Sequence, residues 1–120
     1  MPRFVILEHD HPHLHWDLML EAGSVLRTWR LLAPPSIGQT VPAAAIGDHR
    51  MMYLDYEGPV SGGRGRVTRW DAGSFQWQQD EPKRVAVLLE GRRCRGRIVL
   101  TGSEIGEWLL TFDEVRAESQ

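Results

Sequence analysis

The sequence contains a single cysteine, Cys94, and no long apolar segment. One cysteine cannot form a disulfide within the chain, and its scarcity fits a reducing compartment. The opening residues MPRFVILEHD hold only a short apolar run before charge appears, too short for a signal peptide or a membrane span. We therefore expect a soluble, cytoplasmic protein that does not enter a membrane.

The chain also lacks a marked excess of charge. Its 14 basic and 16 acidic residues leave a formal charge of -2, so a nucleic-acid substrate would have to be gripped locally rather than by a net positive field. All basic residues except Lys83 are arginine, whose planar guanidinium suits phosphate oxygens. With 120 residues, the chain can build one core but not two, which predicts a single domain over residues 1–120.

Few segments have the length or the 3.6-residue period of a helix. Short apolar or alternating runs predict a mostly β, single-domain fold with little helix, a closed or partly closed β-barrel of about eight strands, because closure removes exposed edges. The expected strands are residues 3–9, 14–21, 25–32, 50–58, 65–73, 84–91, 95–102 and 107–115. Hairpin turns are expected at residues 71–73 and 90–93. The proline-containing residues 33–42 predict a loop, followed by one helical turn within residues 43–49.

Four of the five histidines lie in the stretch EHDHPHLHWDLMLE, residues 8–21. Strand alternation separates an apolar set, Leu14, Trp16, Leu18 and Leu20, from a second set, His15, Asp17, Met19 and Glu21. His15 and Asp17 can then offer a nitrogen and an oxygen to one metal ion, and His9 can supply a third ligand if the chain turns back near Pro12. Two nitrogens and one oxygen with open positions are typical of a catalytic metal site.

Spacing alone leaves an alternative open, because histidines around a proline also occur as exposed turn residues. His11 and His13, which flank Pro12, suit that alternative best. The segment GDHRMMYLDYEG is expected to project His49 and Tyr53 from one strand face, where they could bind a phosphate oxygen or move a proton. A buried tyrosine beside a hydrogen-bonded histidine is the purely structural interpretation of the same pattern.

Several segments resemble, in the same order, the 3′-phosphoesterase domain of bacterial DNA ligase D. FVILEHDHPHLHWDLMLE is similar to that family's F-V-x-x-E-H-D, which is followed after a short spacer by L-H-Y-D-F-R-L-E. VLRTWRLLAPPS is similar to L-K-S-W-A-V-P-K-G-P-S, DHRMMYLDYEG to D-H-P-L-D-Y-x-D-F-E-G, and GRVTRWDAG to G-T-V-x-V-W-D-x-G. With the closing segments LLEGRRCRGRIVL and EWLLTF, the resemblance extends from Phe4 to Phe112.

This resemblance implies a compact β-barrel that uses Mn²⁺ to process 3′ ends of DNA strand breaks, removing a terminal ribonucleoside and then the remaining 3′-phosphate. Carried over by position, the family's metal ligands correspond to His9, His15 and Asp17. Its phosphate-contacting residues and further polar pocket positions, the catalytic candidates, correspond to His49, Tyr53, Glu8 and Glu21.

Three cationic positions of the family are changed in this sequence. The arginine two residues beyond the metal-binding aspartate is Met19, and a lysine and a second arginine fall at Ala33 and Val41. A thioether supplies no charge to a phosphate, so another arginine would have to replace these groups. The candidates for phosphate binding are Arg30, Arg64 and Arg66. The last two lie in SGGRGR, which also suits a plain solvated loop because no helix follows it.

The leading hypothesis is a metal-dependent phosphoesterase of non-homologous end joining that removes a 3′-ribonucleoside or 3′-phosphate from DNA or RNA, with Mn²⁺ or another divalent metal. No residue is recognisable as a covalent nucleophile, so metal-activated water is the simpler proposal. The alternatives are a catalytically reduced module that binds DNA ends or a repair partner, and a phosphodiesterase for a smaller substrate. By analogy with the family, a separately encoded ligase or the Ku end-binding protein would be the partner.

Overall fold

The computed structural model describes residues 1–115, in which the chain forms nine β-strands and one short 3-10 helix. The strands are β1 (Arg3–His9), β2 (His15–Ala22), β3 (Val25–Leu31), β4 (Thr40–Arg50), β5 (Gly58–Pro59), β6 (Arg66–Glu81), β7 (Arg84–Gly91), β8 (Arg95–Gly102) and β9 (Trp108–Asp113). The helix is η1 (Met51–Leu54). Within residues 1–115, no helix has the length and apolar character needed to cross a membrane.

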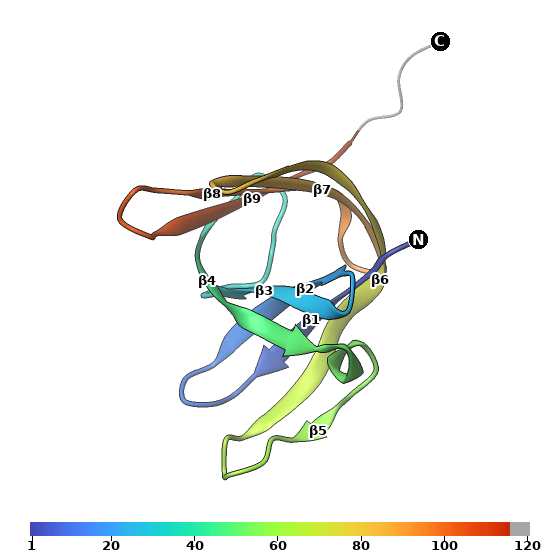
Figure 1. The fold of residues 1–120 in the computed structure, drawn as a ribbon, viewed down its shortest axis with the longest axis vertical. Coiled ribbons are helices and arrows are strands. Elements are labelled where there is room, and N and C mark those ends of the chain that lie inside the picture. The colour runs from blue at the N-terminus through green and yellow to red at the C-terminus, as the bar shows by residue number, and fades with distance from the viewer. Residues whose placement is uncertain (116–120) are drawn as a thin grey trace.

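Eight of these strands form a closed ring of antiparallel neighbours, as Figure 1 shows. The order is β1-β2-β3-β4-β9-β8-β7-β6, and β6 pairs with β1 to complete the ring. β5 pairs only with the start of β6 and lies outside the ring. The prediction of a mostly β fold in which about eight strands close on themselves is confirmed.

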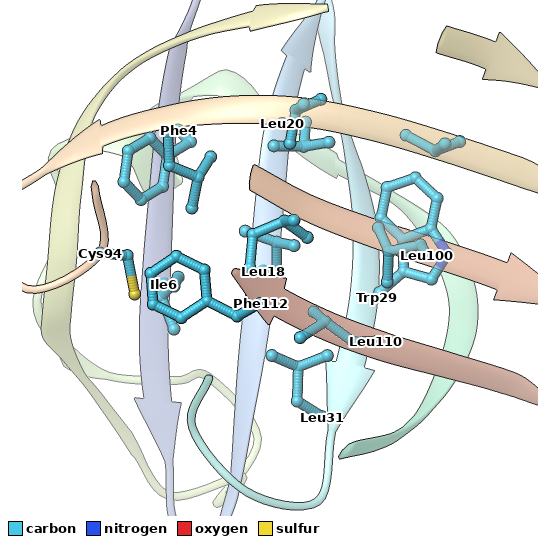
Figure 2. Close-up of a cluster of buried hydrophobic side chains, with 14 of the residues drawn as sticks. Phe4, Ile6, Leu18, Leu20, Trp29, Leu31, Cys94, Leu100, Leu110 and Phe112 are labelled. Carbon is cyan, nitrogen blue, oxygen red and sulfur yellow. The ribbon is translucent and has the colours of Figure 1, made fainter. Parts of the chain in front are cut away.

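The larger apolar cluster lies between β1–β3 on one side and β7–β9 on the other (Figures 1 and 2). Figure 2 shows Phe4 and Ile6 of β1 beside Leu18 and Leu20 of β2, and all four are fully buried. The predicted apolar face of β2 is therefore confirmed at Leu18 and Leu20. Leu14 was wrongly included in it, because it precedes β2 and is 54% exposed.

A second apolar cluster covers the opposite face of the same strands. It is formed by Val5, Leu7, Met19, Leu26, Leu54 and Val67. Strand alternation explains why β1 contributes to both clusters, since Val5 and Leu7 point to the opposite face from Phe4 and Ile6. Leu54 belongs to η1, so this short helix closes the cluster from outside. The residues that strand alternation grouped with Met19 therefore face this outer layer, beneath η1 and β5.

The predicted loop is present over residues 33–39, but the prediction was wrong between residues 40 and 57. β4 occupies Thr40–Arg50, where a loop and a helical turn were expected, and residues 51–54 form η1 rather than a strand. Pro42 fits within β4 because it lies just beyond the end of the β3 ladder, where its carbonyl accepts a bond from the Leu32 N–H at 3.2 Å. Its missing N–H therefore costs only one bond at the end of a ladder.

The turn predicted at residues 71–73 was also wrong, since these residues lie within the 16-residue strand β6. The first half of β6 pairs with β1 and the second half with β7. Asp71 is buried at this crossing, and its carboxylate accepts backbone N–H bonds from Arg92, Arg93 and Cys94 at 2.8, 3.2 and 2.8 Å. The turn predicted at residues 90–93 does form, between β7 and β8, and Asp71 holds it in place.

Candidate metal centre

His9, His15 and Asp17 meet at the loop end of the β1–β2 hairpin, where residues 10–14 connect the two strands. The strand register places His9 directly opposite His15, and Asp17 follows two residues later on the same face of β2. One ligand atom from each residue lies within 4.8 Å of the other two. His15 and Asp17 are each only 3% exposed. The hairpin thus assembles, from three side chains, the cluster that the sequence predicted.

Both histidines are oriented by main-chain carbonyls. His15 Nδ1 lies 2.8 Å from the His13 carbonyl oxygen, and His9 Nε2 lies 2.7 Å from that of Arg64. A carbonyl only accepts hydrogen bonds, so these two nitrogens carry protons and donate them. In the neutral imidazoles, the lone pairs are then on His15 Nε2 and His9 Nδ1.

These two lone-pair nitrogens face the same oxygen atom. His15 Nε2 is 3.2 Å from Asp17 Oδ2, and His9 Nδ1 is 3.8 Å from it. Three electron-rich atoms repel one another unless protons or a cation lie among them. Histidines whose outer N–H groups are bonded to carbonyls are the usual form of metal ligands. The donor set and its orientation therefore fit a divalent cation, with two nitrogens and one oxygen.

Arg30 is the cation nearest to this cluster. It lies opposite Asp17 in the β2–β3 register, and its Nε atom is 3.9 Å from Asp17 Oδ1. Among the described residues, neither of these two buried atoms has a hydrogen-bond partner. The Arg30 side chain is nevertheless 41% exposed, so part of the guanidinium reaches solvent beside the cluster.

A pocket of about 540 Å³ opens over the cluster. His9, Asp17 and Arg30 line it together with His49 and Tyr53, whose ring centroids are 5.8 Å apart. The expected pair is therefore at the pocket, although its geometry differs from the prediction: His49 is in β4, and Tyr53 is in η1 rather than farther along the same strand. His49 Nδ1 donates to the Gly47 carbonyl at 2.9 Å, which leaves Nε2 available to a ligand.

The other predicted site residues divide into near and distant groups. Arg64 lines the pocket, whereas Arg66, Glu8 and Glu21 do not. Glu8 alternates with His9 and so leaves β1 on the opposite face. Glu21 is at the far end of β2, where its Oε1 accepts the Arg3 backbone N–H at 2.8 Å. The structure therefore does not bring Glu8, Glu21 or Arg66 to the metal cluster.

The three positions that lost the family's cations have different surroundings. Met19 lies at the pocket wall and is 1% exposed within the outer apolar cluster. Val41 is buried in the inner core, and Ala33 packs against that core. Only Met19 therefore leaves an uncharged side chain in the pocket itself.

Sequence reasoning missed Arg50 and Asp48, which also line the pocket, and it treated His11 as a bystander although His11 lies in the lining too. Arg50 follows His49 directly, so strict alternation would direct it away. The strand ends at Arg50 and η1 begins, which changes that direction. In the sequence, only the charged run GDHR could have indicated that Asp48 and Arg50 belong to the pocket.

Cys94 takes no part in the pocket. It is fully buried in the inner core, and burial, together with the nearby Asp71 carboxylate, raises the pKa of its thiol to about 12. A thiol that stays protonated is a poor nucleophile. Cys94 is therefore not a candidate nucleophile.

Comparison with known proteins places this geometry in a family. Residues 7–102 match the family model described as the DNA ligase D 3′-phosphoesterase domain. The multifunctional non-homologous end joining DNA repair protein LigD of Mycobacterium tuberculosis is 33% identical over 115 residues, which cover 88% of this chain and 15% of that protein. LigD of Pseudomonas aeruginosa is 30% identical over 105 residues, covering 79% of this chain and 12% of that protein.

The chain belongs to the DNA ligase D 3′-phosphoesterase domain family. It spans about 12–15% of the length of these two relatives. LigD of Mycolicibacterium smegmatis is similar as well, with 29% identity over 125 residues that cover 89% of this chain and 16% of that protein.

Proposed function

We propose that this domain is a metal-dependent phosphoesterase that processes 3′ ends of DNA or RNA during non-homologous end joining. The observation that carries the proposal is the convergence of His9 Nδ1 and His15 Nε2 on Asp17 Oδ2, with both outer nitrogens tied to carbonyls. We assign Mn²⁺ as the metal, with other divalent ions as substitutes. The relatives' names support end joining as the process.

A metal bound by this set would polarise a phosphate oxygen and lower the pKa of a bound water. The chain's own groups do the rest. Arg30, Arg50 and Arg64 surround the pocket with positive charge and would bind the non-reacting phosphate oxygens. His49 Nε2 would pass a proton to or from the phosphate, and the Tyr53 hydroxyl would orient it by a hydrogen bond.

A second candidate is a module that binds ends without cleaving them, or that cleaves a smaller phosphodiester. Its supporting observation is Met19, which places an apolar side chain in the pocket wall where the family has an arginine. Because the pocket still holds several arginines, we favour the phosphoesterase. A repair ligase or the Ku end-binding protein, encoded separately, would be its partner in either case.

Metal binding and cleavage test the proposal together. Isothermal titration with Mn²⁺ should show one site in the unaltered protein and a loss of affinity of at least about 100-fold in His15→Ala, because a buried ligand is removed. Cleavage of oligonucleotides that end in a 3′-ribonucleotide or a 3′-phosphate should fall to background in the same variant.

His13→Ala is the matched control. The His13 side chain is exposed, and only its carbonyl, which the substitution preserves, contacts His15. We expect this variant to bind Mn²⁺ and cleave like the unaltered protein. Binding of Mn²⁺ and of DNA without turnover would favour the second candidate, and equal Mn²⁺ affinity of all three proteins would refute the metal site.

A further inference from the structure

A second concave site lies farther along the β1–β6 pairing, beyond the metal cluster. It has a volume of about 510 Å³ and is lined by Arg69, Trp70, Asp71, Ala72, Arg92 and Arg93. These residues come from β6 and from the turn between β7 and β8. None of them lines the metal pocket, so this arginine site is separate from the centre described above.

The lining of the arginine site holds more positive than negative charge. Its one acidic group, Asp71, is 3% exposed and is bonded through both carboxylate oxygens to backbone N–H groups. Within residues 1–115, Arg69, Arg92 and Arg93 form no ion pair with a carboxylate. The lining therefore contains three guanidinium groups and one buried carboxylate. Outside the lining, the Glu57 carboxylate accepts the Arg69 backbone N–H at 2.7 Å. Arg3 and, less strongly, Arg69 lower the pKa of Asp55.

The site is also held in place by contacts on the protein side. The bonds from Asp71 to the N–H groups of Arg92 and Arg93 fix the main chain of the turn. The Arg93 guanidinium lies 4.7 Å from the centre of the Trp70 ring, a stacking contact that orders a guanidinium without using its N–H donors. Arg69 donates to the Leu54 carbonyl at 3.3 Å, which keeps its other N–H groups available for a ligand.

We propose that the arginine site binds backbone phosphates of the nucleic-acid strand whose 3′ end occupies the metal pocket. The inference rests on the proposed function and extends it to a second contact. β6 links the two places, because Val67 lines the metal pocket and Arg69 lines the arginine site two residues later. Val67 pairs with His9 and Asp71 pairs with Ile6, three residues away on β1. At about 3.3 Å per residue, the two sites are therefore roughly 10 Å apart along the strand.

That separation matches a nucleic-acid strand. Each strand of a duplex carries one phosphate per about 3.4 Å of helix axis, so the second contact lies roughly three nucleotides from the reacting end. Guanidinium forks recognise phosphates by paired hydrogen bonds, and arginine next to an aromatic ring is a common element of strand-binding surfaces. An acidic protein segment could bind the same arginines, but its binding would not explain why the arginine site lies next to a pocket suited to phosphate.

The test is direct binding, measured in the His15→Ala background without added metal so that cleavage plays no part. Fluorescence anisotropy with a labelled 12-base-pair duplex that carries a recessed 3′ end would compare Arg92→Gln/Arg93→Gln with Lys83→Gln/Arg84→Gln. The control pair is exposed, removes the same charge, and lies at the other end of β7. Thermal melting would confirm that both variants are folded.

We expect the Arg92→Gln/Arg93→Gln variant to bind about 10-fold more weakly and the control to change less than about 2-fold. The slope of log affinity against log salt should fall by about 2 in the first variant, because two phosphate contacts are lost. Equal weakening of both variants, or no weakening of either, would overturn the inference. A third outcome would also overturn it: Arg92→Gln/Arg93→Gln keeps its DNA affinity, but a polyglutamate peptide displaces the duplex only from proteins with intact Arg92 and Arg93. Absence of DNA binding by the parent protein would refute the inference together with the proposed function.

Discussion

At the scale of single residues, the site depends on which nitrogen of each histidine is protonated. The period of two in β2 was enough to predict that His15 and Asp17 share a face, because both lie in one short strand. The carbonyls that orient the imidazoles could not be predicted. The Arg64 carbonyl belongs to a loop 55 positions away from His9, and backbone atoms leave no mark on residue identity.

Arg30 is the residue that we expect to replace the charge missing at Met19. It adjoins Asp17 across the β2–β3 pair and has an unpartnered buried Nε atom. Arg30→Ala should weaken binding of a 3′-phosphate oligonucleotide and lower its cleavage by about 10- to 100-fold, equivalent to about 1.5–3 kcal/mol for a charge-assisted hydrogen bond. Arg30→Lys should recover only part of the loss, since lysine cannot form a bidentate pair.

Arg66→Ala provides the comparison for Arg30. Arg66 is exposed, and its side chain does not line the pocket, so the variant should bind and cleave within about 2-fold of the unaltered protein. Anisotropy and single-turnover kinetics would measure both effects. Identical behaviour of Arg30→Ala and Arg66→Ala would show that Arg30 is not the replacement for the lost arginine.

At the scale of elements, β6 connects the two halves of the ring. It leaves β1 and joins β7 near Gly73, which faces Gly91 across the β6–β7 pair. A side chain at Gly73 would overlap the main-chain carbonyl of Glu90. The glycine at residues 71–73 was predicted to serve a turn at positive φ, which is wrong: Gly73 lies in a strand, and glycine is needed there because the Glu90 carbonyl approaches closely.

Gly73→Ala should therefore lower the free energy of unfolding by about 1–3 kcal/mol, the usual cost of inserting a carbon atom into a closely packed place. Gly47→Ala is the matched control, because an added Cβ there meets no atom within 4 Å, and it should change stability by less than about 0.5 kcal/mol. Urea denaturation followed by tryptophan fluorescence would measure both values. Equal midpoints and slopes would contradict the close approach at Gly73.

The two elements that were predicted wrongly share a cause. The segment RMMYLDYEG alternates like a strand, and AAAIGDH has residues that favour helices, yet the first contains η1 and the second lies in β4. β4 is stabilised by pairing with the preceding strand β3 and with β9, which lies far later in the chain. The helix or strand preference of a short segment is weak, and pairing with neighbouring strands overrides it.

At the scale of the whole molecule, ring closure was predictable from the number of strands, but the position of its weakest join was not. β4 pairs with β9 only over Thr40–Ala43, whereas Ala44–Arg50 bond to β3 alone. β2 is paired on both sides from Trp16 to Leu20. The ring should consequently open first at the short β4–β9 pairing, and residues 44–50, next to His49, should be weakly protected because one edge of β4 is unpaired there.

Hydrogen exchange would detect this opening. Amides in residues 44–50 should exchange at least about 10-fold faster than those in residues 15–22, because one edge of the first segment is unpaired and open to water. Binding of a 3′-phosphate oligonucleotide should slow exchange in residues 44–50, since the pocket includes His49 and Arg50. Uniform protection of the two segments in the free protein would contradict the weak join.

The contact between His9 and the Arg64 carbonyl also bears on how the sequence of this domain can change over evolutionary time. The loop SGGRG contributes a peptide oxygen to the metal cluster, and every amino acid supplies that oxygen. Exchange of Arg64 for another residue would therefore keep His9 oriented, whereas an insertion or deletion between β5 and β6 would move the oxygen away. Drift in this loop should be restricted in length, and it should also be restricted to glycine at Gly65, where φ is positive and an added Cβ would overlap Asp10.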